Sequence, residues 1–244
     1  MALLEALGLS LPAYAHVSLF TGSDGAPLSK RNGSISINDL REQGYLPIAV
    51  ANYLSRVGHT IADNDLKTYR ELADSFKIDN ISSSPSKFDM DQLLYWQKKA
   101  VEDLNIDECK SWLIDSLEDL PSSIDKDNFI ALIKDNINFP HEAQDYLNNL
   151  FLTPLGERSE IIDVIRSAGK EFYLQAQEVI TSEIIDWNET AKNIGSITGK
   201  KGKELFMPLR CAITGQTKGP ELDRVVNLIG TQQVIKKLKE ASEL

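Results

Sequence analysis

Residues 22 to 31 read Gly-Ser-Asp-Gly-Ala-Pro-Leu-Ser-Lys-Arg, a glycine-containing turn with a cationic end. Successive backbone N–H groups of such a turn can point at one anion, while Lys30 and Arg31 add positive charge and Ser29 adds a hydroxyl. These are the groups that hold phosphates. The Gly-x-x-x-x-Gly-Lys-Ser/Thr spacing of a P-loop is absent, so the segment taken alone also fits a solvated turn.

A second cationic group lies near the C-terminal end of the chain and consists of Lys200, Lys201, Lys203 and Arg210. Lys and Arg side chains position RNA by contacting its phosphates, so this group predicts contact with an RNA backbone. A solvated basic loop explains the same residues equally well. The sequence does not decide between these two interpretations.

The distribution of charge bears on RNA binding. The net charge of −10 argues against a nucleic-acid partner, because phosphate binding uses Lys and Arg. Residues 192–244, however, contain ten basic and five acidic side chains, whereas residues 102–163 contain fifteen acidic and four basic ones. The chain is therefore polarised, although the acidic stretch is also typical of a solvated face.

The sequence contains no pattern that predicts a disulfide, a metal site, a membrane span or a signal peptide. The two cysteines, Cys109 and Cys211, are far apart, and the three histidines form no ligand cluster, so we expect neither a disulfide nor a metal site. No run of roughly 18 apolar residues and no signal peptide are present, so we expect no membrane association and a cytoplasmic location.

Helical periodicity dominates the chain after residue 35 and predicts a mainly α fold. Asn38 is predicted to cap a short helix ending at Gly44, and Pro47 to begin the next helix. Further helices are predicted to start at Asp125 and Pro140. Three tryptophans fall on helical apolar stripes and are predicted to belong to the core: Trp96, Trp112 and Trp187.

The last third of the chain carries three further expectations. Two helical stripes separated at Gly169 are predicted, the second continuing as far as Trp187. The apolar run from Leu205 to Ile213 fits either a short buried helix or a strand. Residues 220–230 and 231–244 are predicted to form two short helices that close the chain.

Several segments resemble bacterial-type glutamyl-tRNA synthetases, which are class I aminoacyl-tRNA synthetases. Residues 24–33, Asp-Gly-Ala-Pro-Leu-Ser-Lys-Arg-Asn-Gly, look like the Lys-Met-Ser-Lys-Ser loop in its glutamyl form, Leu-Ser-Lys-Arg-x-Gly. Residues 41–58 resemble the family's segment F-R-x-x-G-Y-L-P-x-A-hydrophobic-x-N-Y-L-x-x-hydrophobic-G, and Ser84-Pro-Ser-Lys-Phe-Asp89 resembles its S-P-A-x-F-D turn. Residues 199–215 followed by Gly219-Pro-Glu-Leu resemble its C-terminal signature, and residues 6–16 look like the stretch that leads into the loop, whereas the resemblance is weak across the acidic middle of the chain.

The resemblance implies a role for the first cationic group. In this family the signature lysine and its neighbours bind the triphosphate of ATP, so Lys30 is expected to be the principal phosphate-binding residue, supported by Ser29 and Arg31. ATP and magnesium are expected in the intact enzyme and neither on this chain alone. Pro27 departs from the lysine usual at its position, which would either stiffen the loop or weaken its contact with ATP.

The resemblance also implies a division of the chain. Residues 1–37 would be a short remnant of the class I catalytic domain with the signature loop, 38–101 a helical stem-contact domain, and 102–244 an all-helical anticodon-binding domain. The His-Ile-Gly-His-type motif and the glutamate pocket of the family have no counterpart, so no catalytic site is complete. We expect a monomer that binds tRNA and is inactive alone.

Two other interpretations remain open. The chain could be a natural truncated paralogue that binds RNA without catalysis. It could also be a helical scaffold whose acidic surface binds a basic protein. Salt-dependent binding of tRNA separates either RNA interpretation from the scaffold.

Overall fold

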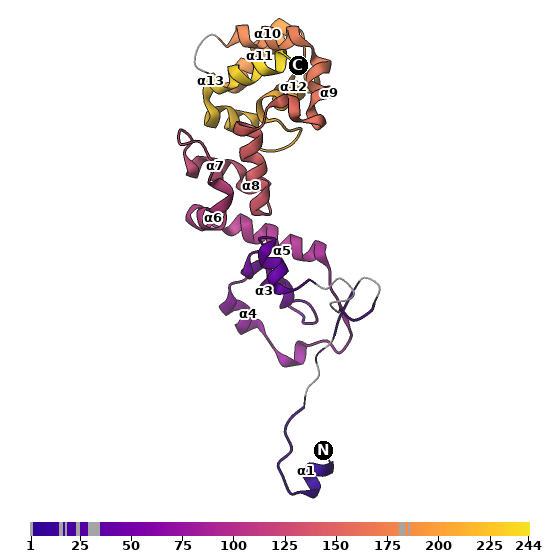
Figure 1. Ribbon diagram of the computed structural model, residues 1–244. Coiled ribbons are helices and arrows are strands. Elements are labelled where there is room, and N and C mark those ends of the chain that lie inside the picture. The colour runs from indigo at the N-terminus through magenta and orange to yellow at the C-terminus, as the bar shows by residue number, and fades with distance from the viewer. Residues whose placement is uncertain are drawn as a thin grey trace. The chain divides into compact units, whose positions relative to one another are not determined.

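The computed structural model describes residues 2–14, 17, 19–22, 25–28, 35–180, 184 and 186–244. The chain divides into two compact units, Met1–Ala100 and Val101–Leu244. Helices dominate and strands are short, which confirms the prediction of a mainly α fold (Figure 1). The proposed boundaries near residues 37 and 101 remain predictions of domain function.

The first unit contains short helices around one small parallel strand pair. Its elements in chain order are α1 (Ala2–Ala6), β1 (Phe20–Thr21), α2 (Ile37–Glu42), α3 (Pro47–Leu54), α4 (Tyr69–Ser75), a 3₁₀ turn (Ile78–Asn80), β2 (Ser86–Lys87) and the start of α5 (Met90–Asp103). Phe20 pairs with Ser86 and Thr21 with Lys87. Two-residue strands are too short for sequence periodicity to predict.

Helix starts in the first unit follow from their capping residues. Pro47 occupies the first turn of α3 as predicted, where its missing N–H costs nothing. The predicted Asn38 cap is wrong, because α2 begins at Ile37 and its N-cap is Ser36. The Ser36 hydroxyl accepts from Asp39 N–H (3.1 Å) while the Asp39 carboxylate accepts from Ser36 N–H (2.7 Å). This reciprocal capping box satisfies two backbone donors that Asn38 could not reach.

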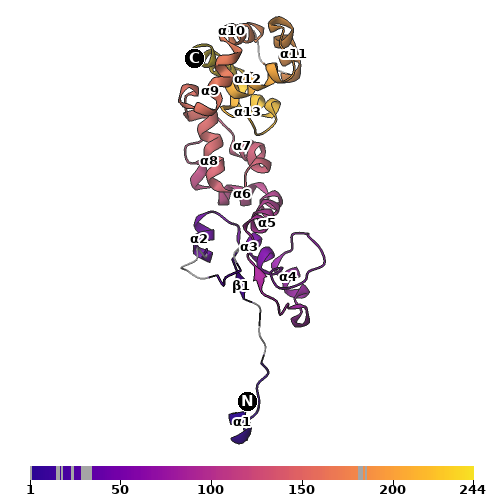
Figure 2. The same cartoon turned by 90° about the vertical axis from the view of Figure 1, so that its right-hand side faces the viewer.

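The second unit is helical throughout the part of it that the structure describes (Figure 2). Its main helices are α6 (Ile106–Trp112), α7 (Lys126–Ile133), α8 (Pro140–Leu147), α9 (Ser159–Ala168), α10 (Lys170–Val179), α11 (Trp187–Thr198), α12 (Lys203–Thr214) and α13 (Leu222–Ser242). A π-helical turn (Asn148–Leu152) follows α8, and 3₁₀ turns cover Asp115–Leu117, Lys134–Asn136 and Leu155–Glu157. Asp125 and Pro140 start α7 and α8 as predicted.

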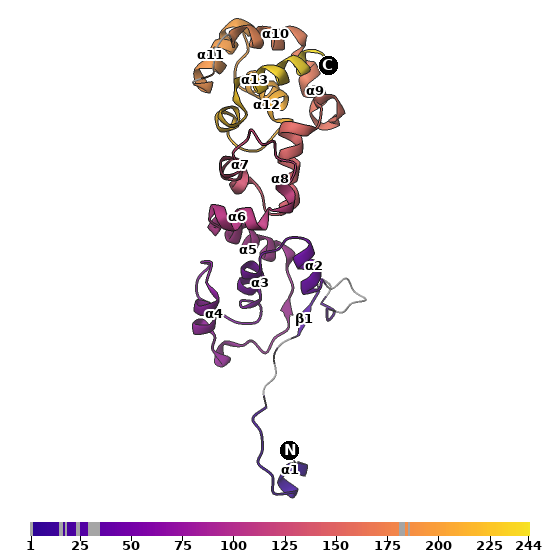
Figure 3. The same ribbon diagram turned by 60° about the vertical axis from the view of Figure 1, so that its left-hand side comes forward.

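The core of the second unit forms where α13 packs against α10 and α12, and α12 packs against α9 (Figure 3). Leu209, Ala212, Val234 and Leu238 are fully buried there. The run from Leu205 to Ile213 is therefore the buried helix α12 and not a strand. Among the three tryptophans, Trp96 and Trp187 are buried in their respective units, whereas Trp112 is only half-buried.

Glycine positions determine where several of these helices end. Gly230, with φ +76° and ψ 161°, interrupts α13 and separates the two closing helices that the sequence predicted. Gly169, with φ +83°, separates α9 from α10 as predicted. The second stripe is nevertheless wrong in its length, because α10 ends at Val179 and Trp187 instead begins α11, whose N-cap is Asp186.

Candidate functional sites

The segment that leads into the signature loop is a tight turn. Gly22 N–H donates to Ala26 O (2.8 Å), and Leu28 N–H donates to Phe20 O (3.0 Å). Gly25 lies at the tip with φ +78°, a conformation that favours glycine. The turn ends at Leu28, directly before Ser29, Lys30 and Arg31, which lie outside the residues that the structure describes. Their assignment to ATP phosphates stays a prediction.

Pro27 has a defined place in this turn. It forms an antiparallel bridge with Thr21. The hydrogen bonds of the bridge are made by the residues on either side, so the position needs no N–H from Pro27 itself. Proline at this position therefore restricts the backbone of the turn without removing a hydrogen bond, which supports the stiffening interpretation.

The base of the turn is attached to the rest of the first unit through β2 and α3. Phe88 N–H donates to Thr21 O (2.9 Å), and Asp89 N–H donates to the Tyr53 hydroxyl (2.6 Å). The Tyr53 and Phe88 rings meet edge to face, with 5.3 Å between their centroids. The Asp89 carboxylate then accepts from Gln92 N–H (3.2 Å) at the start of α5. The Ser-Pro-Ser-Lys-Phe-Asp segment therefore positions the turn.

A buried polar network in the same unit was not predicted from the sequence. Asn52 is fully buried, and its side chain accepts from Lys67 N–H (2.9 Å) and donates to Lys67 O (2.7 Å). The Arg56 guanidinium lies 4.0 Å from the centroid of the Trp96 ring and donates to Asp65 O (2.8 Å). These residues hold the loop before α4 against α3 and α5, so they are structural.

An open pocket of about 550 Å³ lies between α3, β2 and the start of α5. Its lining carries charges of both signs, from Arg56, Lys87 and Asp89. His59, also in the lining, stacks on Phe76 with 5.3 Å between ring centroids, and its Nε2 accepts from Lys77 N–H (3.2 Å). This pocket lies outside both predicted cationic groups.

The lysines of the C-terminal cationic group are accessible. Lys201 and Lys203 are exposed and Lys200 is half-buried. Lys200 and Lys201 lie in the connection between α11 and α12, and Lys203 is the first residue of α12; Gly199 (φ +69°) ends α11 and Gly202 (φ +52°) precedes α12. Their exposure is consistent with contact to an external phosphate, and their role stays a prediction.

Arg210 is placed differently from the lysines. It is half-buried on α12, and its Nη1 donates to Pro220 O (2.9 Å) in the loop before α13. The same loop is fixed by Thr214, whose hydroxyl donates to Arg210 O (2.8 Å) and accepts from Gln216 N–H (3.2 Å). Arg210 therefore orients a loop and also faces the same side of α12 as Lys203, seven residues earlier.

Two other cations of the second unit are used internally. Lys237 is 4% exposed, and its Nζ donates to Asn149 O (3.1 Å). Burial, together with the nearby Arg158, lowers the pKa of Lys237 to about 8. Arg158 donates to the backbone oxygens of Asn148 (3.1 Å) and Thr153 (2.8 Å), so it fixes the end of the π-helical turn. Neither side chain is available to RNA.

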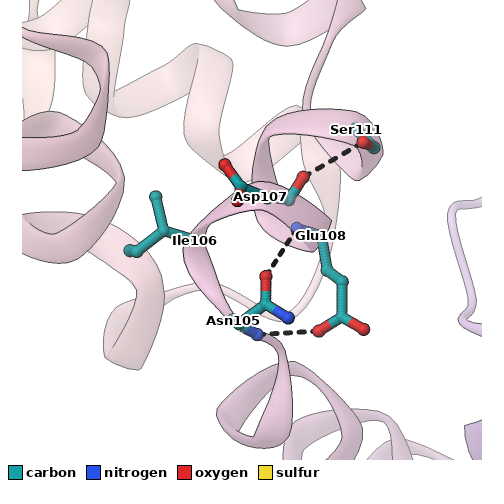
Figure 4. Close-up of a pocket in the computed structure, with 5 residues that line it drawn as sticks. All are labelled: Asn105, Ile106, Asp107, Glu108 and Ser111. Carbon is teal, nitrogen blue, oxygen red and sulfur yellow. Dashed lines mark hydrogen bonds between the residues drawn. The ribbon is translucent and has the colours of Figure 1, made fainter.

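A surface pocket of about 400 Å³ lies at the start of α6, and the polar groups that line it have structural roles (Figure 4). Asn105 Oδ1 accepts from Glu108 N–H (3.0 Å), and Glu108 Oε2 accepts from Asn105 N–H (2.8 Å). Ser111 donates to Asp107 O (3.0 Å). These polar groups complete the first turn of a seven-residue helix and are not arranged around a ligand.

Metal ligation and membrane crossing find no support in the part of the chain that the structure describes. No three His, Cys, Asp or Glu side chains among residues 2–14, 17, 19–22, 25–28, 35–180, 184 and 186–244 gather as metal ligands. Within those same residues, no helix has the length and apolarity required to cross a membrane.

Models of two protein domain families match the chain, one in each unit. Residues 1–95 match the catalytic domain of class I tRNA synthetases (E and Q), and residues 127–242 match an anticodon-binding domain. The first match includes Ser29, Lys30 and Arg31. The fold and the two matches give the chain the domain types of a class I tRNA synthetase, part of a catalytic domain followed by an anticodon-binding domain.

The curated proteins that are similar to this chain are glutamate–tRNA ligases, a narrower group within this class. The chain is 41% identical to glutamate–tRNA ligase 1 of Halorhodospira halophila over 245 residues, covering 100% of this chain and 51% of the relative. It is 36% identical to glutamate–tRNA ligase 2 of Coxiella burnetii, covering 100% and 52% respectively. Over its whole length the chain is similar to glutamate–tRNA ligases, and it spans about half the length of the curated relatives it matches.

Solved structures agree on the fold. The glutamate–tRNA synthetase of Elizabethkingia anophelis superposes with a TM-score of 0.76 at 19% identity, covering 100% of this chain and 53% of that structure. The glutamate–tRNA ligase of Elizabethkingia meningosepticum, solved in complex with its amino acid, gives a TM-score of 0.77 at 20% identity, covering 99% and 53%.

Proposed function

We propose that the chain is the C-terminal, tRNA-binding half of a glutamate–tRNA ligase, the enzyme that joins glutamate to its tRNA using ATP. The observation that carries this proposal is the order of two matches in one chain: a class I catalytic-domain segment over residues 1–95, then an anticodon-binding domain over residues 127–242. We propose that it acts in the cytoplasm as a monomer.

Within this function the first 37 residues supply one part of the ATP site. Lys30 is the main contact to the triphosphate, and Ser29 and Arg31 support it. The tight turn at residues 20–28 and its attachment through β2 support this role, because a cationic loop acts on developing charge only when its base is held in place. Magnesium enters the proposal only as the partner of ATP in the intact enzyme.

The remainder of the chain supplies the contacts to tRNA. Residues 38–101 form the stem-contact region and residues 102–244 the anticodon-binding region. Lys200, Lys201, Lys203 and Arg210 contact the RNA backbone. The exposure of Lys201 and Lys203 and the fixed position of Arg210 support this assignment.

The isolated chain should form no glutamyl-adenylate. One phosphate-binding loop without a His-Ile-Gly-His-type partner and a glutamate pocket cannot align the reactants, and alignment supplies much of the rate of such a reaction. Glutamate-dependent exchange of pyrophosphate into ATP measures this step, with a full-length glutamate–tRNA ligase as positive control. Exchange by the chain clearly above a no-protein blank would overturn the half-enzyme proposal.

The genomic codons upstream of Met1 distinguish a ligase half from a truncated paralogue. An in-frame His-Ile-Gly-His-like motif there would favour a ligase that continues upstream. A stop codon close to Met1, together with retained tRNA binding, would favour the paralogue. A chain that fails to bind tRNA at low salt would favour the protein-interaction scaffold.

Replacing Lys200, Lys201 and Lys203 together by Ala should weaken tRNA binding several-fold and flatten its salt dependence. Each phosphate contact that is lost reduces the slope of log K against log salt by about 0.7 for a single strand. Filter binding at two or more salt concentrations measures both quantities.

A matched control for this triple variant removes the same charge elsewhere in the second unit. Lys192, Lys236 and Lys239 are exposed lysines on α11 and α13, and their replacement by Ala should leave the salt slope close to that of the wild type. Equal slopes for the wild type and the Lys200, Lys201, Lys203 variant would show that the loop is merely solvated.

A further inference from the structure

One exposed aromatic side chain on α12 has no structural explanation within the second unit. Phe206 is 46% exposed, whereas the other apolar residues of α12 are buried or half-buried. In residues 101–180, 184 and 186–244 it is the one exposed Phe, Tyr or Trp. The exposed part of its ring contributes no burial free energy to the fold. Its ring is therefore accessible to a binding partner.

Cations lie on both sides of Phe206 along the helix. Lys203 precedes it by three residues and Arg210 follows it by four, so the three side chains share one face of α12. Residues 199–219 contain five basic side chains and one acidic side chain, Glu204, in a chain whose net charge is −10. The charge around Phe206 therefore favours a polyanion over a neutral or basic partner.

The loop beside this face is held in a fixed position. Arg210 donates to Pro220 O, and the Thr214 hydroxyl accepts from Gln216 N–H (3.2 Å). Gly219 has φ +134°, and a Cβ there would lie 3.0 Å from the Tyr146 hydroxyl. The exposed Lys218 therefore projects from a loop that needs little further ordering on binding.

We propose that Phe206 is a stacking platform for one unpaired base of the bound RNA, with Lys203 and Arg210 on the adjoining backbone. Unpaired RNA bases stack on aromatic side chains, and every base offers a π face, so the contact adds affinity without requiring a particular base. This inference rests on the proposed tRNA-binding function, which it deepens by adding a residue that contacts a base.

The test uses the full 244-residue chain and a glutamate tRNA transcript. Phe206→Leu keeps an apolar side chain but removes the π face, and it should weaken tRNA binding about tenfold, within the range measured for base–aromatic stacking. Phe206→Trp should bind within about twofold of the wild type because it restores a stacking surface. The salt slope should be the same in all three proteins, since an aromatic contact releases no counterion.

Two controls make the result specific. Leu152 is 49% exposed on the π-helical turn, so Leu152→Ala removes a similarly exposed apolar side chain and should leave tRNA affinity unchanged. A fully paired RNA duplex should bind the wild type and Phe206→Leu equally, because its bases are not free to stack. Circular dichroism should give the same helical content for every variant.

The outcomes separate this inference from the proposed function. Absence of tRNA binding by the wild type at low salt would overturn the proposed function itself. Wild-type binding with no loss in Phe206→Leu, or an equal loss in Phe206→Trp, would overturn the stacking platform alone. Unchanged tRNA affinity combined with loss of self-association in sedimentation would assign Phe206 to a protein contact instead.

Discussion

Replacing Arg158 by Met should lower the free energy of unfolding of the second unit by about 3 kcal/mol or more, because it leaves several partly buried carbonyl groups without a donor. Its Nη2 donates to the backbone oxygens of Asn148 (3.1 Å), Asn149 (3.1 Å) and Thr153 (2.8 Å). Its Nη1 donates to Asn149 Oδ1 and to Gly215 O (3.4 Å). One guanidinium therefore ties the π-helical turn to the end of α12.

Urea unfolding followed by circular dichroism measures this effect as a lower midpoint. Arg166→Met is the matched control, since Arg166 is exposed and has one long contact, from its Nε to Leu244 O (3.4 Å), so its loss should change stability by less than about 0.5 kcal/mol. A midpoint for Arg158→Met equal to that of Arg166→Met would contradict the assignment of Arg158 as the element that fixes this turn.

A second variant, Gly215→Ala, disrupts the same contacts of Arg158 by changing the residue that its guanidinium packs against. Gly215 has φ +69°, and a Cβ there would lie 1.9 Å from Arg158 Nη1, so Gly215→Ala must displace the guanidinium as well as strain the backbone. Its destabilisation should not add fully to that of Arg158→Met, because both changes disrupt one set of contacts.

Helix boundaries were the part of the fold that the sequence predicted best, because a few local residues determine them. Asp125 accepts from Asn128 N–H (2.9 Å) at the start of α7, Pro140 starts α8, and Gly230 divides α13 through its positive φ. Asn38 failed because Ser36, two residues earlier, has the Asp39 partner that completes a capping box. Capping therefore depends on a pair of residues, and one residue type alone is ambiguous.

Burial was harder to predict than helix position. Tyr69 and Phe76 continue an apolar stripe in the sequence, yet they are 58% and 57% exposed, because a stripe is buried only where another element covers it. Gln97 shows the reverse: it is fully buried because its side chain accepts from Leu46 N–H (2.9 Å). Neither outcome can be deduced from periodicity, which describes one helix at a time.

The candidate sites show the same limit of sequence reasoning. Residue type and order in the sequence singled out the glycine-containing turn and the lysines around the start of α12 as candidates, and their functional roles stay predictions. Phe206 lies within an apolar run that fits a core segment of either kind, so its exposure becomes visible only when the helical phase of α12 is known. The motif residues Asn52 and Tyr53, by contrast, are buried structural residues.

In a full-length ligase that contains this segment, Lys30→Ala should lower the rate of glutamate activation by about 10² or more. Lys30 is proposed to be a cation directed at the charge that develops on the triphosphate as pyrophosphate leaves, and removing one such group typically costs a factor of this size. Glutamate-dependent ATP–pyrophosphate exchange measures the rate, and filter binding measures tRNA affinity, which should barely change.

The control for Lys30→Ala is Lys126→Ala, which removes an exposed lysine at the start of α7 and should affect neither measurement. A further variant, Lys30→Arg, tests whether Lys30 acts through its charge. It keeps the charge and so should retain much more activity than Lys30→Ala if the role of the residue is electrostatic, although its fork geometry differs from that of an ammonium group. If tRNA affinity collapses in Lys30→Ala while activation survives, Lys30 contacts RNA and the assignment to ATP phosphates is wrong.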